Sequence, residues 1–119
     1  MKIGQSAELR RAISPEDVAA YTALSGHETA DQAVPEPLIN ALFSYLLGVK
    51  LPGRGTNYLK QQTAFLKDAE VGQTLVARVE ITRLRPEKQL VDLRTLCQTE
   101  DGQPIADGRA LVYVEDVER

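Results

Sequence analysis

The stretch from Val34 to Gly53, VPEPLINALFSYLLGVKLPG, decides the fold that this sequence predicts. Pro35 and Pro37 open it, and proline suits the first turn of a helix, where its missing N–H is not needed. Gly48 is the type of residue that ends a helix in a left-handed conformation. Apolar residues lie on nearly every side between these points, which predicts a helix of about three turns that is buried all round. The run is shorter than the roughly 20 apolar residues of a membrane span.

Upstream of this helix, the sequence predicts a short strand and a capped helix. Residues 8–13 have a strand pattern, and Ser14, Pro15 and Asp17 then form the N-cap, the first helical position and the acidic partner of a capping box. Gly26 is expected to end that helix. Its apolar stripe is expected to consist of Val18, Tyr21 and Leu24.

Downstream of the central helix, alternating apolar residues predict four strands joined by hairpin-sized turns. The strands are expected at residues 57–66, 75–82, 90–99 and 105–114. Gly108 is expected at a bulge or a close approach of two strands. Hairpin turns predict an antiparallel sheet, and such a sheet can curl around one apolar helix. The sequence therefore predicts a single α+β domain over residues 1–119 in the hotdog arrangement, with a homodimer covering an open sheet edge.

Composition excludes several classes of function. The net charge is −3, so the chain lacks the basic footprint of a protein that binds DNA or RNA. One histidine and one cysteine do not supply a metal site. The lone Cys97, expected to be a small buried residue, fits a reducing compartment. The N-terminal residues lack the apolar core of a signal peptide, so we expect a cytoplasmic protein without membrane contact.

Four stretches of the chain resemble the MaoC-like hydratase family of hotdog proteins, which includes the (R)-specific enoyl-CoA hydratases. They are ISPEDVAAYTALSG at 13–26, LFSYLLGVKLPGRGTNYLKQ at 42–61, FLKDAEVGQTLVARVEIT at 65–82 and TEDGQPIADGRALV at 99–112. The resemblance implies addition of water to an enoyl thioester, or the reverse dehydration, in fatty acid metabolism. The implied partner is an acyl-CoA or an acyl carrier protein thioester, and no cofactor is implied.

The resemblance also implies an active site in the loop between the two helices. In the family, an Asp and a His in this loop act on one water as general base and acid. Here His27 stands where the family has Asp, and Gln32 stands where it has His, so the usual pair is not retained. His27 is then either a solvated residue at a helix end or the partner of Asp31 in an inverted pair. Ser44 matches the serine that supports this loop in the family.

The first turn of the central helix carries a second part of the implied site. A backbone N–H there polarises the thioester carbonyl in the family. Pro37 has no N–H, which leaves the N–H of Leu38 as the donor. Glu36 is either a charge that stabilises the helix start or a carboxylate that faces the thioester, as in hotdog thioesterases. The substrate-binding residues expected beside it are Leu38, Asn57, Tyr58 and Gln61, with Tyr58 alternatively a plain core aromatic.

Three functions remain open at this point. The first is an enoyl-CoA hydratase or dehydratase with a degenerate loop, in which His27 and Asp31 activate water. The second is an acyl-CoA thioesterase that uses Glu36 or Asp31. The third is a catalytically silent protein that binds an acyl group or completes a heteromeric hydratase. Three cations are placed to meet a CoA phosphate, although isolated surface cations are usually only solvated; they are Arg54, Lys60 and Arg85.

Overall fold

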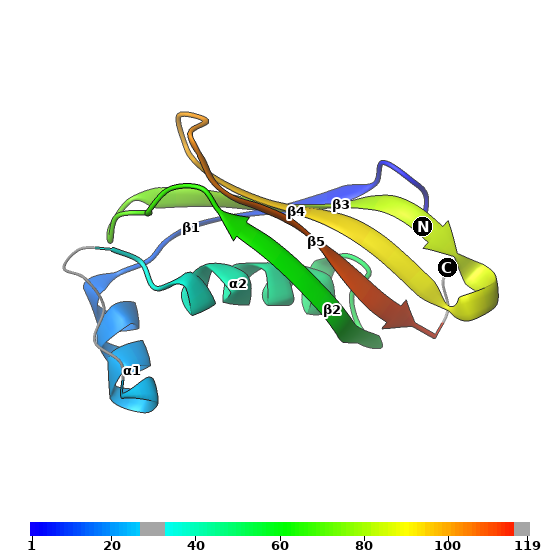
Figure 1. Ribbon diagram of the computed structural model, residues 1–119, viewed down its shortest axis with the longest axis horizontal. Coiled ribbons are helices and arrows are strands. Elements are labelled where there is room, and N and C mark those ends of the chain that lie inside the picture. The colour runs from blue at the N-terminus through cyan, green and yellow to red at the C-terminus, as the bar shows by residue number, and fades with distance from the viewer. Residues whose placement is uncertain (27–32, 116–119) are drawn as a thin grey trace.

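The computed structural model describes residues 1–26 and 33–115, which form a curved antiparallel sheet with helices on its concave side (Figure 1). The strands are β1 (Ser6–Ala12), β2 (Thr56–Phe65), β3 (Thr74–Arg85), β4 (Leu90–Thr99) and β5 (Pro104–Val114). They lie in the order β1-β3-β4-β5-β2, so β1 and β2 are the two edges of the sheet. The helical elements are α1 (Pro15–Ser25), α2 (Glu36–Tyr45), a π turn (Leu46–Lys50) and a 3-10 turn (Pro86–Lys88). The predicted order of elements and the wrapping of a helix by a sheet are confirmed.

The capping box of α1 is confirmed in both directions. The Ser14 backbone N–H donates to the Asp17 carboxylate at 2.9 Å, and the Asp17 N–H donates to the Ser14 hydroxyl at 3.1 Å. Gly26 ends the helix in the left-handed region at φ 74°. The predicted apolar stripe is wrong at Leu24, which is 91% exposed, because α1 points away from the sheet (Figure 1).

The central helix exists as predicted, but it is not buried all round. One side packs against the sheet through apolar side chains, and these residues are Ile39, Leu42, Phe43, Leu46 and Leu47. The opposite side is exposed at Ser44 and Tyr45, because a single sheet covers only one side of a helix. The predicted stop at Gly48 is also wrong. The helical backbone continues through a π turn, in which the Leu51 N–H donates to the Leu46 carbonyl at 2.8 Å.

The concave face of the sheet forms the other half of the core. Alternate residues of β3 and β4 have no exposed surface, as the period of two predicted for β3. They are Leu75, Ala77, Val79, Ile81, Val91, Leu93, Thr95 and Cys97. Gly108 on β5 lies where β2 approaches closely. A Cβ at that position would overlap the carbonyl oxygen of Gln62 and lie 2.9 Å from the Cα of Thr63. The predicted close approach at Gly108 is therefore confirmed.

Two features of the sheet bear on partners. The edge strand β2 is interrupted by a shift of register between Tyr58 and Lys60, where it pairs with β5. An edge strand leaves one row of N–H and C=O groups available to another strand.

Within residues 1–26 and 33–115, no helix is long and apolar enough to cross a membrane.

Candidate functional site

The loop that was predicted to activate water lies outside the described residues. It contains His27, Asp31 and Gln32, and it joins Gly26 at the end of α1 to Ala33. Its exit is held by the connection between β2 and β3. Ala33 bridges to Glu70, and the Val34 N–H donates to the Ala69 carbonyl at 2.8 Å. These contacts hold the chain just before α2 begins.

The first turn of α2 offers fewer donors than most helix starts. Pro35 is the N-cap and makes no side-chain cap, while Pro37 has no N–H to give. The Leu38 N–H, which the sequence left as the donor for a thioester carbonyl, donates instead to the Pro35 carbonyl at 3.0 Å. The side chain of Glu36 is exposed at this turn. The Leu38 N–H therefore does not stand open to a ligand.

Ser44 lies on the exposed side of α2. Its hydroxyl has no hydrogen-bond partner among the residues that the structure describes. Tyr45 beside it is 47% exposed, and Val49 in the following π turn is 60% exposed. This side of the helix is thus a partly apolar surface that carries two hydroxyls, those of Ser44 and Tyr45.

A polar cluster that the sequence analysis missed joins the buried part of α2 to β2. The Gln61 amide nitrogen donates to the Asn40 oxygen at 2.6 Å and to the Thr63 hydroxyl at 3.1 Å. The Thr63 hydroxyl donates to the same Asn40 oxygen at 3.2 Å. The Asn40 nitrogen has no partner within the described part of the chain, so it remains a donor. The only signal in the sequence was a single asparagine within an apolar helical run.

The other predicted binding residues on β2 differ in burial. Tyr58 is half-buried against the core, and its hydroxyl is buried without a partner among the described residues. Burial raises the pKa of the Tyr58 hydroxyl to about 12, so it stays protonated and can donate a hydrogen bond. Asn57 is exposed, and its strand position faces Tyr113 of β5 in register.

Leu38 lies in a different place from these β2 residues. It lines a groove of about 380 Å³ between β1, α1 and α2, together with Leu9, Ile13, Ala41, Leu42 and Tyr45. An ion pair between Arg11 and Asp17, 3.3 Å long, stands at this groove. Gln61 instead belongs to the cluster between α2 and β2. The structure therefore does not bring the four predicted binding residues together in one cavity.

The described residues contain no group of three or more His, Cys, Asp or Glu side chains that could hold a metal ion. Cys97 is fully buried as predicted, and burial raises the pKa of its thiol to about 11. A neutral buried thiol is a poor nucleophile and a poor metal ligand. The polar groups that the structure describes around α2 are instead the side chains of Asn40, Gln61, Thr63 and Tyr58, which can form hydrogen bonds.

Comparisons with known proteins place the chain in a family. No family model matches the sequence. The (R)-specific enoyl-CoA hydratase of Rhodospirillum rubrum is 35% identical over an alignment of 128 residues, which covers 96% of this chain and 88% of that protein. The structure of the (R)-hydratase of Aeromonas caviae has a TM-score of 0.91 at 34% identity, over 96% of this chain and 97% of that one. The chain belongs to the MaoC-like hydratase family.

A third comparison agrees with this assignment. The unliganded R-hydratase of Pseudomonas aeruginosa has a TM-score of 0.90 at 26% identity, over 98% of this chain and 83% of that one. The predicted hotdog fold and the resemblance to MaoC-like hydratases are confirmed. The alignment with the Rhodospirillum rubrum protein is longer than the 119 residues of this chain, so that relative has residues without a counterpart here.

Proposed function

We propose that this MaoC-like protein hydrates enoyl thioesters or dehydrates the corresponding hydroxyacyl thioesters, with a degenerate active-site loop. The observation that carries the proposal is its 34–35% identity to two (R)-specific enoyl-CoA hydratases over nearly the whole chain. A 3-hydroxybutyryl-CoA dehydratase from Methylorubrum extorquens at 28% identity supports the same reaction type. The substrate is proposed to be an acyl chain on CoA or on an acyl carrier protein.

We assign the proton transfers to His27 and Asp31. In hydration, the oxygen of water adds to the β-carbon and a proton adds to the α-carbon, while the thioester bond stays intact. One group must take a proton from water and one must deliver a proton to carbon. Both residues belong to the short segment between Gly26 and Ala33, and the contacts of Ala33 and Val34 hold its exit near the start of α2. The positive end of the α2 dipole favours charge that develops on the thioester oxygen.

Absorbance of crotonyl-CoA tests the proposal. We expect the purified protein to remove the enoyl absorbance, and His27→Ala to lower turnover by about 10²-fold or more, as for loss of a general acid or base. The free energy of unfolding should not change. Glu28→Ala, in the same segment, is the matched control and should keep its rate. A wild-type rate in His27→Ala would refute the assignment of the pair.

A catalytically silent acyl-binding subunit is the second candidate. It is favoured by the first turn of α2, where Pro37 lacks an N–H and the Leu38 N–H is engaged by Pro35. This candidate predicts no loss of enoyl absorbance and no release of thiol, together with a higher unfolding temperature in the presence of acyl-CoA. Release of free thiol would instead indicate a thioesterase that uses Glu36 or Asp31.

We further propose that the protein is a cytoplasmic homodimer that continues the sheet at an edge. Two surfaces support this: the edge strand β2 and the exposed side of α2 around Tyr45 and Val49. Sedimentation equilibrium at micromolar concentration should give twice the chain mass. A single-chain mass under these conditions would refute the dimer. The neutral, buried thiol of Cys97 suits a reducing compartment.

A further inference from the structure

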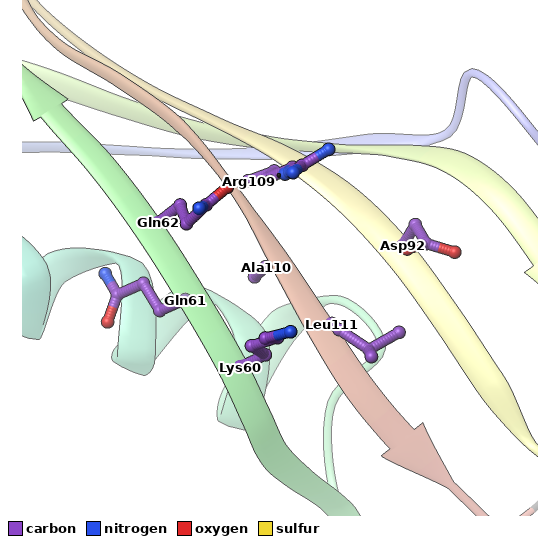
Figure 2. Close-up of a pocket in the computed structure, with 7 residues that line it drawn as sticks. All are labelled: Lys60, Gln61, Gln62, Asp92, Arg109, Ala110 and Leu111. Carbon is purple, nitrogen blue, oxygen red and sulfur yellow. Dashed lines mark hydrogen bonds between the residues drawn. The ribbon is translucent and has the colours of Figure 1, made fainter.

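A small hollow lies on the convex face of the sheet, on the side away from α2. Its volume is about 140 Å³, and it is formed where β2, β5 and β4 run side by side (Figure 2). The residues that line it are Lys60, Gln61 and Gln62 of β2, Arg109, Ala110 and Leu111 of β5, and Asp92 of β4. The Gln61 side chain reaches the other way, to Asn40 of α2. The strand register puts Lys60 opposite Leu111 and Gln62 opposite Arg109. These residues therefore form two adjacent cross-strand rows.

Within residues 1–26 and 33–115, the two cations of this hollow, Lys60 and Arg109, lack a carboxylate partner. Among the residues that the structure describes, no carboxylate oxygen lies within 4.0 Å of Lys60 or Arg109. Arg109 is held in place differently, because its Nε donates to the side-chain oxygen of Gln62 at 2.9 Å. By contrast, Arg78 and Arg94 on the same face are each paired with a carboxylate at 2.8 Å.

Two of the side-chain acceptors around the hollow are engaged, while Asp92 Oδ1 has no partner among the residues that the structure describes. Asp92 supplies the carboxylate of the lining, and its Oδ2 accepts from the Arg85 Nη2 at 2.6 Å, so its charge is balanced. The Gln62 oxygen is taken by Arg109. The donors that remain are the Lys60 ammonium, the terminal nitrogens of Arg109 and the Gln62 amide nitrogen. With the Asp92 charge paired to Arg85, the hollow presents the two unpaired positive charges of Lys60 and Arg109, which favours an anion with several oxygens.

We infer that this hollow binds a phosphate group. A guanidinium that is held by a neighbouring side chain matches two phosphate oxygens, and an ammonium supplies a second charge. The volume of about 140 Å³ is well below the roughly 300–1,000 Å³ of sites that enclose whole ligands. The site therefore takes one phosphate group and leaves the rest of any larger ligand outside. It lies on the opposite face of the sheet from α2, so it goes beyond the proposed hydration site and does not depend on it.

Lys60 also has a simpler explanation. A lysine next to an irregularity on an edge strand discourages pairing with other strands, and Lys60 lies at the register shift of β2. That role needs Lys60 alone. It gives no reason for Gln62 to orient Arg109 beside the same hollow while no described carboxylate pairs with Arg109. The two explanations are distinguished by whether replacement of Arg109 weakens phosphate binding.

Calorimetric titration of the full chain with inorganic phosphate at constant ionic strength tests the site. We expect Lys60→Gln and Arg109→Gln each to weaken phosphate binding about tenfold, as for loss of one charge-assisted contact. Lys67→Gln is the matched control. Lys67 is exposed just beyond the C-terminal end of β2, and its replacement changes the net charge of the protein by the same amount. This control should bind like the wild type.

Titration with CoA and with dephospho-CoA identifies the source of the phosphate. Tighter binding of CoA, with the difference lost in both variants, supports the site and assigns it to the 3′-phosphate of CoA. Equal binding of the two, with inorganic phosphate bound as above, supports the site for free phosphate. Absence of binding at millimolar phosphate, or binding unchanged in both variants, would overturn the inference. Self-association of Lys60→Gln beyond the dimer of the wild type, without any change in phosphate binding, would overturn the inference in favour of edge protection.

Discussion

The concave and convex faces of the sheet present different side chains from the same strands. On the concave face, the residues of β3 and β4 alternate as apolar and fully buried positions under α2. On the convex face, β3, β4 and β5 carry arginines and carboxylates in pairs such as Arg78–Glu80 and Arg94–Asp107. The concave face packs against a helix, whereas the convex face carries exposed charged side chains that do not pack under α2. Chemistry specific to this chain can therefore arise on the convex face without disturbing the fold.

A similar difference divides α2 itself. The residues that face the sheet are closely packed, whereas Ser44 and Tyr45 are exposed. In the first turn Pro35 is buried, whereas Glu36 and Pro37 are exposed, and this turn determines which backbone donors a substrate meets. Packing and chemistry are thus assigned to different parts of one helix. Substitutions on the two sides should have very different costs.

The largest effect is expected from Phe43→Ala. Phe43 has no exposed surface and is among the largest side chains of the core, so its truncation leaves a cavity. We expect a loss of about 3–5 kcal/mol in the free energy of unfolding, measured by urea denaturation. Ser44→Ala, one residue further on the exposed side, should stay within about 0.5 kcal/mol of the wild type. A cost for Ser44→Ala close to that of Phe43→Ala would break the distinction between the two sides.

Gly108→Ala tests the concave face where β5 meets β2. The new Cβ would overlap the Gln62 carbonyl oxygen, which is backbone and cannot rotate away. We expect a loss of about 1–3 kcal/mol in the same measurement, as for an overpacked core. Gly48→Ala is the control, because nothing lies within 4 Å of its Cβ and its φ is not left-handed. Removing a helical glycine should instead stabilise the chain by roughly 0.5–1 kcal/mol.

The concave face was predictable from sequence because side-chain direction alternates strictly along a strand. The period of two over residues 75–81 gave the buried positions, and the turn residues gave strand ends close to the observed ones. The prediction that α2 is buried on all sides was wrong. Apolar residues in a helix do not reveal on how many sides the rest of the same chain covers that helix. The predicted helix end at Gly48 was wrong because a π turn continues the helical backbone as far as Lys50. Local sequence patterns thus predicted which residues face the core, but not how much of α2 is buried or where the helix ends.

The convex face and the polar cluster were not predictable, because they depend on register. Asn40, Gln61 and Thr63 meet only when α2 and β2 are placed together, and Arg109 meets Gln62 only in one strand pairing. The occupation of the Leu38 N–H depends on the backbone geometry of the Pro35 turn. No periodicity encodes these distances. The sequence therefore named Lys60 as one of three candidate cations but did not pair it with Arg109.

Titration should also separate the two faces. Burial raises the pKa of the concave-face thiol of Cys97 from 9.0 to about 11, so its contribution is fully present below pH 9 and is lost as pH rises toward 11. On the convex face, a hydrogen bond from Arg94 lowers the pKa of Asp107 below 3.8, so its contribution is present above pH 3.8 and is lost as pH falls through the lowered value. Urea denaturation across pH should show both losses. The loss of unfolding free energy at alkaline pH should be smaller in Cys97→Ala, and an unchanged loss would contradict a buried thiol. The raised pKa of Tyr58 adds a loss of its own only above pH 10.

The smallest effect is expected from Arg94→Gln. Two Arg94 nitrogens donate to the two oxygens of Asp107 at 3.2 and 2.8 Å, but the arginine side chain is 56% exposed. Solvent and salt screen such a pair, so its removal should cost about 0.2–1 kcal/mol and less at high ionic strength. Arg109→Gln, directly opposite Arg94 in the register, is the control. Because Arg109 has no carboxylate partner within the described residues, its replacement should leave stability unchanged while it weakens phosphate binding. A cost for Arg94→Gln as large as that of Gly108→Ala would mean that the convex face also holds the fold together, and the contrast between the faces would fail.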